Sequence, residues 1–184
     1  MPMHAASTLP DQPWTAIADP QTCVIVEERA LGALAADAAA LAASGMVHRA
    51  QGSPAEIALQ LAALPRGMRD DIAALSSRYC ALLAIAACRV RLEVLDRQPC
   101  WKWHADYVRV RLLTTYTGAG TEYLPSPDAN EAMAQQLPLA AIGLFKGHRF
   151  ANDHAPCIHR SPPFGAGDPV RLLLVIDEVP ADDA

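Results

Sequence analysis

Residues 100–124 read CWKWHADYVRVRLLTTYTGAGTEYL, and this stretch decides the fold. Its middle part, 107–116, alternates apolar side chains with polar ones, which is typical of a half-buried β-strand. The following Gly118-Ala-Gly120 predicts a turn, after which the chain can pair back. Short runs of the same kind predict further strands at 90–95, 121–124, 139–146, 157–160 and 170–176. Short strands separated by Gly and Pro turns indicate a β-sandwich or barrel.

The chain before residue 90 has a helical character. Apolar residues at helical spacing predict three helices, over 27–44, from 53 to 65, and over 68–89. Gly45 is placed to cap the first helix, and the Ser-Pro-Ala-Glu sequence at 53–56 forms a capping box for the second. The β-branched run at 23–26 predicts an edge strand. Helices followed by a run of strands indicate an α+β protein.

Composition and charge exclude several classes of function. Fifteen Lys and Arg against twenty Asp and Glu give a formal net charge of −5, which argues against nucleic acid or an anionic membrane as the main partner. The first residues lack the features of a secretory signal, and no apolar stretch approaches the ~18–20 residues of a membrane span. Five cysteines without a CxxC motif predict reduced thiols and a cytoplasmic protein.

The sharpest chemical signal is the pair His104 and Asp106. Residues two apart on an extended segment project from the same face, so an imidazole and a carboxylate can bind one divalent metal there. A second histidine, His159, follows on another predicted strand, and Arg171 begins the last strand. Two histidines and one carboxylate form the facial triad of non-haem Fe(II) oxygenases, which leaves metal positions open. A His-x-Asp pair alone is also common by chance.

The order of these motifs over about residues 100–177 resembles the 2-oxoglutarate/Fe(II) double-stranded β-helix superfamily. Residues 118–122 occupy the place of that superfamily's Gly-Gly-Glu-Thr turn. The resemblance implies that Arg171 binds the far carboxylate of 2-oxoglutarate, since a guanidinium fork suits a carboxylate. The superfamily usually has Ser or Thr two residues after this Arg, and here that residue is Leu173. Arg160, next to the second histidine, is the alternative positive charge.

A narrower resemblance covers most of the chain. The His-x-Asp block at 104–106, the Thr-Tyr-x-Gly-x-Gly-Thr block at 115–121 and the His-Arg-Ser-Pro block at 159–162 resemble the bacterial domain-of-unknown-function family eighteen-twenty-six. Genes of that family tend to lie beside zinc-responsive regulators and metal-trafficking GTPases. The resemblance therefore implies a role in zinc limitation and supports a metal site, without naming a reaction.

Together these patterns predict an α+β fold in which Ala-rich helices pack on a cupin-like double-stranded β-helix, or jelly-roll, half. The predicted organisation is one compact domain. Its parts are an extended N-terminal arm at 1–20, a helical region at 21–98, a metal-binding double-stranded β-helix core at 99–178 and an acidic tail at 179–184.

Five further residues allow two interpretations each. Cys100 and Cys157 lie close to the proposed ligands in sequence, so their thiolates could bind zinc, or they could be buried packing residues. Arg109 and Arg111 alternate with apolar residues, so they could line an anionic pocket or form ion pairs on a solvated face. His148 could be a ligand, although a loop histidine is commonly solvated.

Three functional hypotheses follow. The first is an Fe(II)- and 2-oxoglutarate-dependent oxygenase acting on a small molecule, with His104, Asp106 and His159 on the metal and Arg171 on the cosubstrate. The second is a zinc-binding protein for storage or delivery, which would meet a metal-trafficking partner and catalyse no reaction. The third is a zinc hydrolase that uses a metal-bound water.

Overall fold

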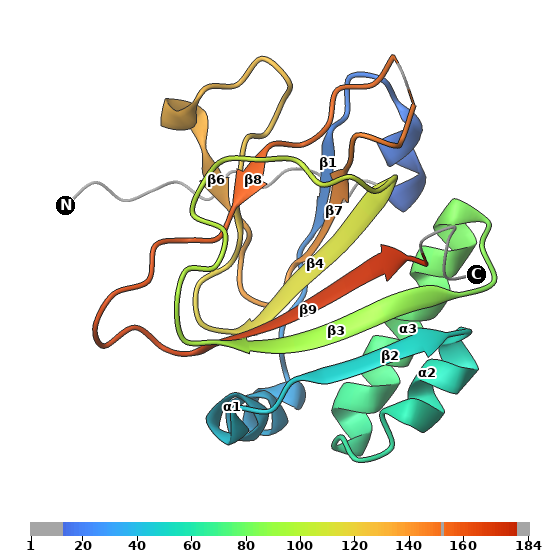
Figure 1. The fold of residues 1–184 in the computed structure, drawn as a ribbon, viewed down its shortest axis with the longest axis vertical. Helices are drawn as coiled ribbons and strands as arrows, with labels where there is room; N and C mark the ends of the chain where they lie inside the picture. The colour runs from blue at the N-terminus through green and yellow to red at the C-terminus, as the bar shows by residue number, and fades with distance from the viewer. Residues whose placement is uncertain (1–12, 152, 180–184) are drawn as a thin grey trace.

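The computed structural model describes residues 13–151 and 153–179 as two antiparallel sheets with helices on one side (Figure 1). The large sheet has six strands in the order β1-β7-β4-β9-β3-β2, and the small sheet has three in the order β6-β5-β8. The bounds are β1 Val24–Glu27, β2 His48–Gly52, β3 Cys88–Leu95, β4 Val110–Thr117, β5 Glu122–Tyr123, β6 Gln135–Gln136, β7 Ile142–Lys146, β8 His159–Arg160 and β9 Arg171–Glu178.

The chain winds back and forth between the two sheets. It leaves the large sheet after β3, reaches the small one at His104, which forms a bridge to His159 of β8, and returns in β4. It then builds β5 and β6 in the small sheet, β7 in the large, β8 in the small and β9 in the large. This alternation is a double-stranded β-helix, and it confirms the predicted fold. Strands β1 and β2 extend the large sheet at its two edges, as predicted for 23–26.

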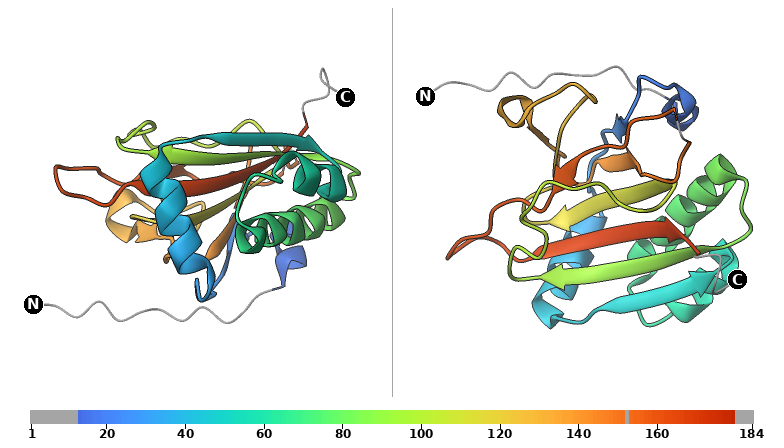
Figure 2. Two further views of the ribbon diagram at one scale, coloured as in Figure 1. Left: turned by 90° about the horizontal axis from the view of Figure 1, so that it is seen from below. Right: turned by 45° about the horizontal axis from the view of Figure 1, so that its top comes forward.

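Three helices cover one face of the large sheet: α1 Leu34–Ser44, α2 Pro54–Gln60 and α3 Arg66–Leu83 (Figure 2). Their apolar side chains form the main core with the sheet, whereas the face toward the small sheet forms a second apolar cluster. Strand β9 contributes side chains to both clusters. Leu172, Leu174 and Ile176 lie in the main core with the helices. Leu173 and Val175 face the other way, into the second cluster. The period of two along β9 therefore directs Arg171 into the space between the sheets.

Local signals explain where most helices end. Gly45 adopts the left-handed conformation after α1, with φ of 68°, and Ser53 and Glu56 form the predicted capping box of α2. The third helix ends at Leu83, not residue 89, since Ala84 turns left-handed and the chain enters β3 at Cys88. Strand β3 then pairs with β9 along its whole length.

Several segments differ from their predictions. The first helix begins at Leu34, because residue 27 belongs to strand β1. Strand β2, with the sequence HRAQG, carries no alternating apolar pattern and was not predicted; its pairing with β3 defines it. The region 21–98, predicted as helical, thus also contributes β1, β2 and β3 to the large sheet.

Both predicted terminal segments lie largely outside the described residues. Of the arm predicted at 1–20, residues 14–18 form the short 3-10 helix η1 Trp14–Ala18, whose Trp14 and Ile17 are buried in the core. A second 3-10 helix, η2 Glu131–Met133, lies in the loop between β5 and β6. Asp177 and Glu178, at the end of β9, are buried although both are acidic. No helix in the described ranges is long and apolar enough to cross a membrane.

Candidate metal centre

Backbone pairing brings the two histidines together although they are far apart in sequence. The His104 amide donates to the His159 carbonyl at 3.0 Å, and the His159 amide donates back at 2.8 Å. This antiparallel bridge sets the two imidazole rings 4.7 Å apart, centroid to centroid. Asp106 follows on the same extended segment, as the His-x-Asp spacing predicts.

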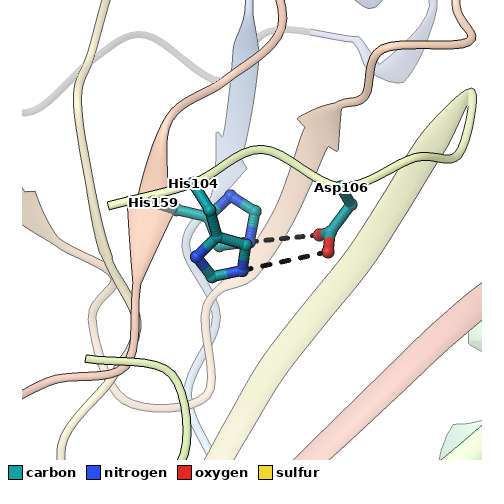
Figure 3. Close-up of side chains that lie close together, drawn as sticks. All are labelled: His104, Asp106 and His159. Atoms are coloured by element: carbon teal, nitrogen blue, oxygen red, sulfur yellow. Dashed lines mark ion pairs between the residues drawn. The ribbon is translucent and has the colours of Figure 1, made fainter. Parts of the chain in front are cut away.

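The three side chains converge on one small volume (Figure 3). Asp106 Oδ2 lies 3.1 Å from His159 Nε2, and Asp106 Oδ1 lies 4.0 Å from His104 Nε2. One potential ligand atom from each residue lies within 4.8 Å of the others. His159 is buried, and the side chain of Asp106 is 12% exposed.

The far nitrogen of each imidazole is held by the backbone. His104 Nδ1 lies 2.9 Å from the carbonyl of Lys102, and His159 Nδ1 lies 3.2 Å from the carbonyl of Cys157. A carbonyl oxygen can only accept, so Nδ1 carries the proton in each hydrogen bond. Both Nε2 atoms then present lone pairs toward Asp106 when the rings are neutral. Metal-binding histidines are oriented in this way by an acceptor on the other ring nitrogen.

The electrostatics of Asp106 fit a cation. Burial by itself raises the pKa of Asp106, but the nearby His159, Arg111 and His104 outweigh burial and hold that pKa below its usual value. Its Oδ2 atom is buried and accepts no hydrogen bond. Two imidazole lone pairs and a carboxylate oxygen that face one another repel, unless a proton or a metal ion lies between them. The residues present therefore fit a divalent metal held by two nitrogens and one oxygen.

A cavity of about 130 Å³ extends from these histidines between the two sheets. Arg171 lies on its wall, where its Nη2 donates to Thr121 Oγ1 at 2.8 Å and to Thr115 Oγ1 at 3.4 Å. Its Nε atom is buried and has no hydrogen-bond partner among the residues that the structure describes. Burial lowers the pKa of Arg171 to about 10, although the charge of Glu93 acts in the opposite direction. Arg171 is thus a buried cation whose hydrogen-bond partners among the described residues are hydroxyls.

Arg160 also lines this cavity, but its charge is already compensated. Its Nε donates to Glu122 Oε2 at 2.6 Å, and its guanidinium lies over the Trp103 ring at 4.3 Å. Between the two arginines that the sequence suggested for an anionic cosubstrate, Arg171 is therefore the one whose hydrogen-bond partners in the described part of the chain include no carboxylate.

The two cysteines proposed as extra ligands lie apart from the cluster of metal-capable atoms, which consists of His104, Asp106 and His159 within the described chain. The buried Cys157 thiol donates to the Leu124 carbonyl at 3.7 Å, and burial raises its pKa well above the usual value. Cys100 is exposed and lies at the mouth of the cavity. The exposed side chain of His148 also lies outside the cluster.

Comparison with known proteins assigns the family. The family described as "Protein of unknown function (DUF1826)" matches residues 16–177. The chain belongs to the DUF1826 family. This is the family that the sequence blocks around His104, residues 115–121 and His159 resemble. No curated protein matches this DUF1826 chain in sequence.

Solved structures share the fold of the DUF1826 chain at low sequence identity. Dioxygenase for auxin oxidation 1 of Arabidopsis thaliana, solved with 2-oxoglutarate, has a TM-score of 0.56 at 10% identity, over 91% of this chain and 87% of that one. The rice dioxygenase for auxin oxidation has a TM-score of 0.52 at 14% identity, over 89% and 76%. A Pseudomonas putida prolyl-4-hydroxylase has 0.51 at 12% identity, over 90% and 96%. The DUF1826 chain therefore has the fold of these oxygenases.

Sequence reasoning missed several residues that shape the site of this DUF1826 protein. The hydroxyls of Thr115 and Thr121 hold Arg171, and their place in the Thr-rich block was the available signal. Asp177 accepts two hydrogen bonds from Arg111, and its place at the end of the last predicted strand gave no signal of this pairing. Arg109 and Arg111 also have different environments, since Arg109 binds Glu178 and only Arg111 reaches Asp106.

Proposed function

We propose that this DUF1826 protein is a non-haem Fe(II)- and 2-oxoglutarate-dependent oxygenase. His104, Asp106 and His159 would hold the metal, and Arg171 would bind the far carboxylate of 2-oxoglutarate. The observation that carries the proposal is that one cavity is lined both by His104 and His159, which converge with the Asp106 carboxylate, and by Arg171, a buried arginine whose hydrogen-bond partners among the described residues are hydroxyls. Bound iron would supply open positions for the 2-oxo acid and for dioxygen.

The protein's own residues bind and orient the reactants. Arg171 has a buried Nε that donates to none of the described residues, so a carboxylate in the cavity can accept a charge-assisted hydrogen bond from it. Thr121 and Thr115 hold the guanidinium in place by accepting from its Nη2. Leu113, Leu173 and Val175 line the same cavity as Arg171 and the histidines, so this part of its wall is apolar.

The distribution of thiols supports a nitrogen and oxygen site. Soft thiolates favour zinc, whereas two imidazoles and a carboxylate with open positions are the ligand set of Fe(II) oxygenases. The Cys157 thiol is directed to the Leu124 carbonyl, in the cluster of apolar residues that also contains Cys23. We therefore rank iron above zinc, and a small-molecule substrate above a metal-trafficking partner.

The test begins with anaerobic purification and measurement of bound metal. The Fe(II)-loaded protein should bind 2-oxoglutarate. When oxygen and ascorbate are added without substrate, it should convert 2-oxoglutarate to succinate and CO₂, with one oxygen atom entering succinate and the other released as water by two electrons from ascorbate. Arg171→Gln and Arg160→Gln form a matched pair, and only the first should lose this turnover. A wild-type protein that binds zinc tightly but shows no 2-oxoglutarate binding with any divalent metal would replace the oxygenase with the zinc-storage function.

A further inference from the structure

Arg111 lies between Asp106 and a second, deeply buried carboxylate. Its Nε donates to Asp177 Oδ1 at 2.7 Å and its Nη2 donates to Asp177 Oδ2 at 2.9 Å, so this pair is bidentate. Its remaining Nη1 donates to Asp106 Oδ1 at 2.5 Å. The arginine therefore uses its whole donor fork to connect β9 with the segment that carries the candidate metal ligands.

This chain of charges is rigid. The side chain of Asp177 is 1% exposed and that of Arg111 is 19% exposed. Both residues lie on neighbouring strands, where Leu112 of β4 pairs with Ile176 of β9 immediately beside them. Because the guanidinium is planar and Asp177 binds two of its nitrogens, the direction of Nη1 toward Asp106 is determined.

The two carboxylate oxygens of Asp106 have different environments because Arg111 binds only one of them. Oδ1 accepts from Arg111, whereas Oδ2 is buried, accepts no hydrogen bond and lies 3.1 Å from His159 Nε2. An oxygen that accepts from a guanidinium is a weaker metal ligand than its free partner, so Oδ2 is the oxygen of Asp106 that is favoured for a metal. A free carboxylate could chelate with both and would take one more position on the ion.

We propose that Arg111 is a positioning residue that makes Asp106 a one-oxygen metal ligand and so preserves the open positions that a chelating cosubstrate requires. The inference rests on the proposed metal site. A bare arginine next to a cation would repel it. The buried Asp177, which also lies 3.5 Å from Arg91 Nη2, lowers that cost because its negative charge is paired with Arg111. This pairing explains why an arginine can lie so close to a metal centre.

Arg109 provides a matched control. It precedes β4 by one residue and is paired through its Nε to Glu178, the neighbour of Asp177 in β9. Its other side-chain contact is with the Leu83 carbonyl, and it neither touches Asp106 nor lines the cavity. Arg109→Gln thus removes an arginine–carboxylate pair in the same part of the sheet without changing the hydrogen bonds of the candidate ligands.

The experiment counts the water molecules on Mn(II) bound to the full-length protein, by the broadening of its electron paramagnetic resonance lines in ¹⁷O-labelled water. A six-coordinate ion with three protein ligand atoms keeps three waters. Wild type and Arg109→Gln should show three, Arg111→Gln should show two, and Arg111→Lys should restore three by donating to Oδ1. Arg111→Gln should also bind 2-oxoglutarate about 10- to 100-fold more weakly in the Mn(II) form.

Three waters and unchanged 2-oxoglutarate affinity in Arg111→Gln would overturn the inference while leaving the metal site intact. If the melting curve shows that Arg111→Gln does not fold, Asp177→Asn replaces it. This variant weakens the two hydrogen bonds that orient the Arg111 guanidinium. It should therefore yield a mixture of two- and three-water spectra. A wild-type spectrum in Asp177→Asn then overturns the inference. Failure of wild type to bind Mn(II) at all would instead contradict the proposed function.

Discussion

Asp106 Oδ2 and His159 Nε2 lie 3.1 Å apart, yet no hydrogen bond satisfies the carboxylate oxygen. The same His159 ring uses its Nδ1 on a backbone carbonyl, so its Nε2 is left as a lone pair when the ring is neutral. Two acceptors held in contact inside a protein are costly unless a cation joins them. The fold maintains this arrangement through the backbone bridge between His104 and His159.

Removing one ligand should abolish stoichiometric metal binding. His104→Ala or Asp106→Ala leaves two protein ligands, so Fe(II), Mn(II) and Zn(II) should all dissociate during equilibrium dialysis followed by elemental analysis. His148→Ala is the control, since its side chain is exposed and its backbone amide keeps its bond to the Asp106 carbonyl. Retention of one tightly held metal per chain in both ligand variants would disprove the assignment.

Arg171 and Arg160 should differ sharply in their effect on 2-oxoglutarate. Losing the buried partner of a carboxylate costs about 2–4 kcal/mol, so calorimetry on metal-loaded Arg171→Gln should show an affinity roughly 30- to 1000-fold lower. Arg160→Gln should change it little, since Arg160 is already paired with Glu122. Metal affinity should survive in both variants. An equal loss in both would mean that the cavity binds its anion through general positive charge.

The metal-free protein should become more stable when Arg171 is removed. Burial lowers the pKa of Arg171 to about 10, which means that the folded state disfavours the charged form. This destabilisation, on the order of 3 kcal/mol, is fully present below pH ~10 and fades as the pH rises toward the unfolded value. Arg171→Met also leaves Thr115 and Thr121 without their donor, so we expect a net gain of about 1–2 kcal/mol in denaturant unfolding at pH 7. If Arg171→Met is instead less stable than wild type, the Thr115 and Thr121 hydroxyls compensate the buried charge of Arg171.

Thiol reactivity should report the environment of each cysteine. Cys100 is exposed, whereas the other four are buried, and burial raises the pKa of Cys88 to about 12. Alkylation of the native protein should therefore modify Cys100 alone, with or without metal, as measured by mass spectrometry. Cys100→Ser with Cys157→Ser should keep its metal and lose only ~0.5–3 kcal/mol of stability. Metal-dependent protection of both thiols would favour the zinc-binding alternative.

Gly147 should be essential for the metal site although it carries no ligand. A Cβ there would lie 2.1 Å from the Val108 carbonyl oxygen and 2.8 Å from that of Asp106. Gly147→Ala should displace the Asp106 segment, cost about 1–3 kcal/mol of stability and weaken metal binding roughly 10- to 100-fold. Gly165→Ala is the control, since its added methyl meets only the Asp168 carboxylate at 3.6 Å. Unchanged metal affinity in folded Gly147→Ala would show that the backbone around Val108 can shift to accept the methyl group without moving Asp106.

Features that depend on near neighbours could be predicted from the sequence. Gly45 and the Ser53 capping box mark helix ends correctly, because a cap involves residues within four positions. Residues 170–176 are almost wholly apolar, so the period of two in a strand is what places Arg171 on the face opposite to Leu172 and Leu174. The His-x-Asp spacing likewise predicts that two candidate ligands share one face. The family follows from short blocks in the sequence, and the family match confirms it.

Features that depend on distant pairing were decided by the tertiary structure alone. Strand β2 exists because β3 offers it backbone partners, not because HRAQG favours a strand. Arg109 and Arg111 look equivalent in sequence, but only Arg111 meets both Asp106 and Asp177, which lie 71 residues apart. Asp177 can be buried next to the candidate site because its ion pair with Arg111 compensates its charge. The sequence alone does not predict these ion pairs, because the burial of a side chain and the compensation of its charge depend on which strands the fold brings side by side.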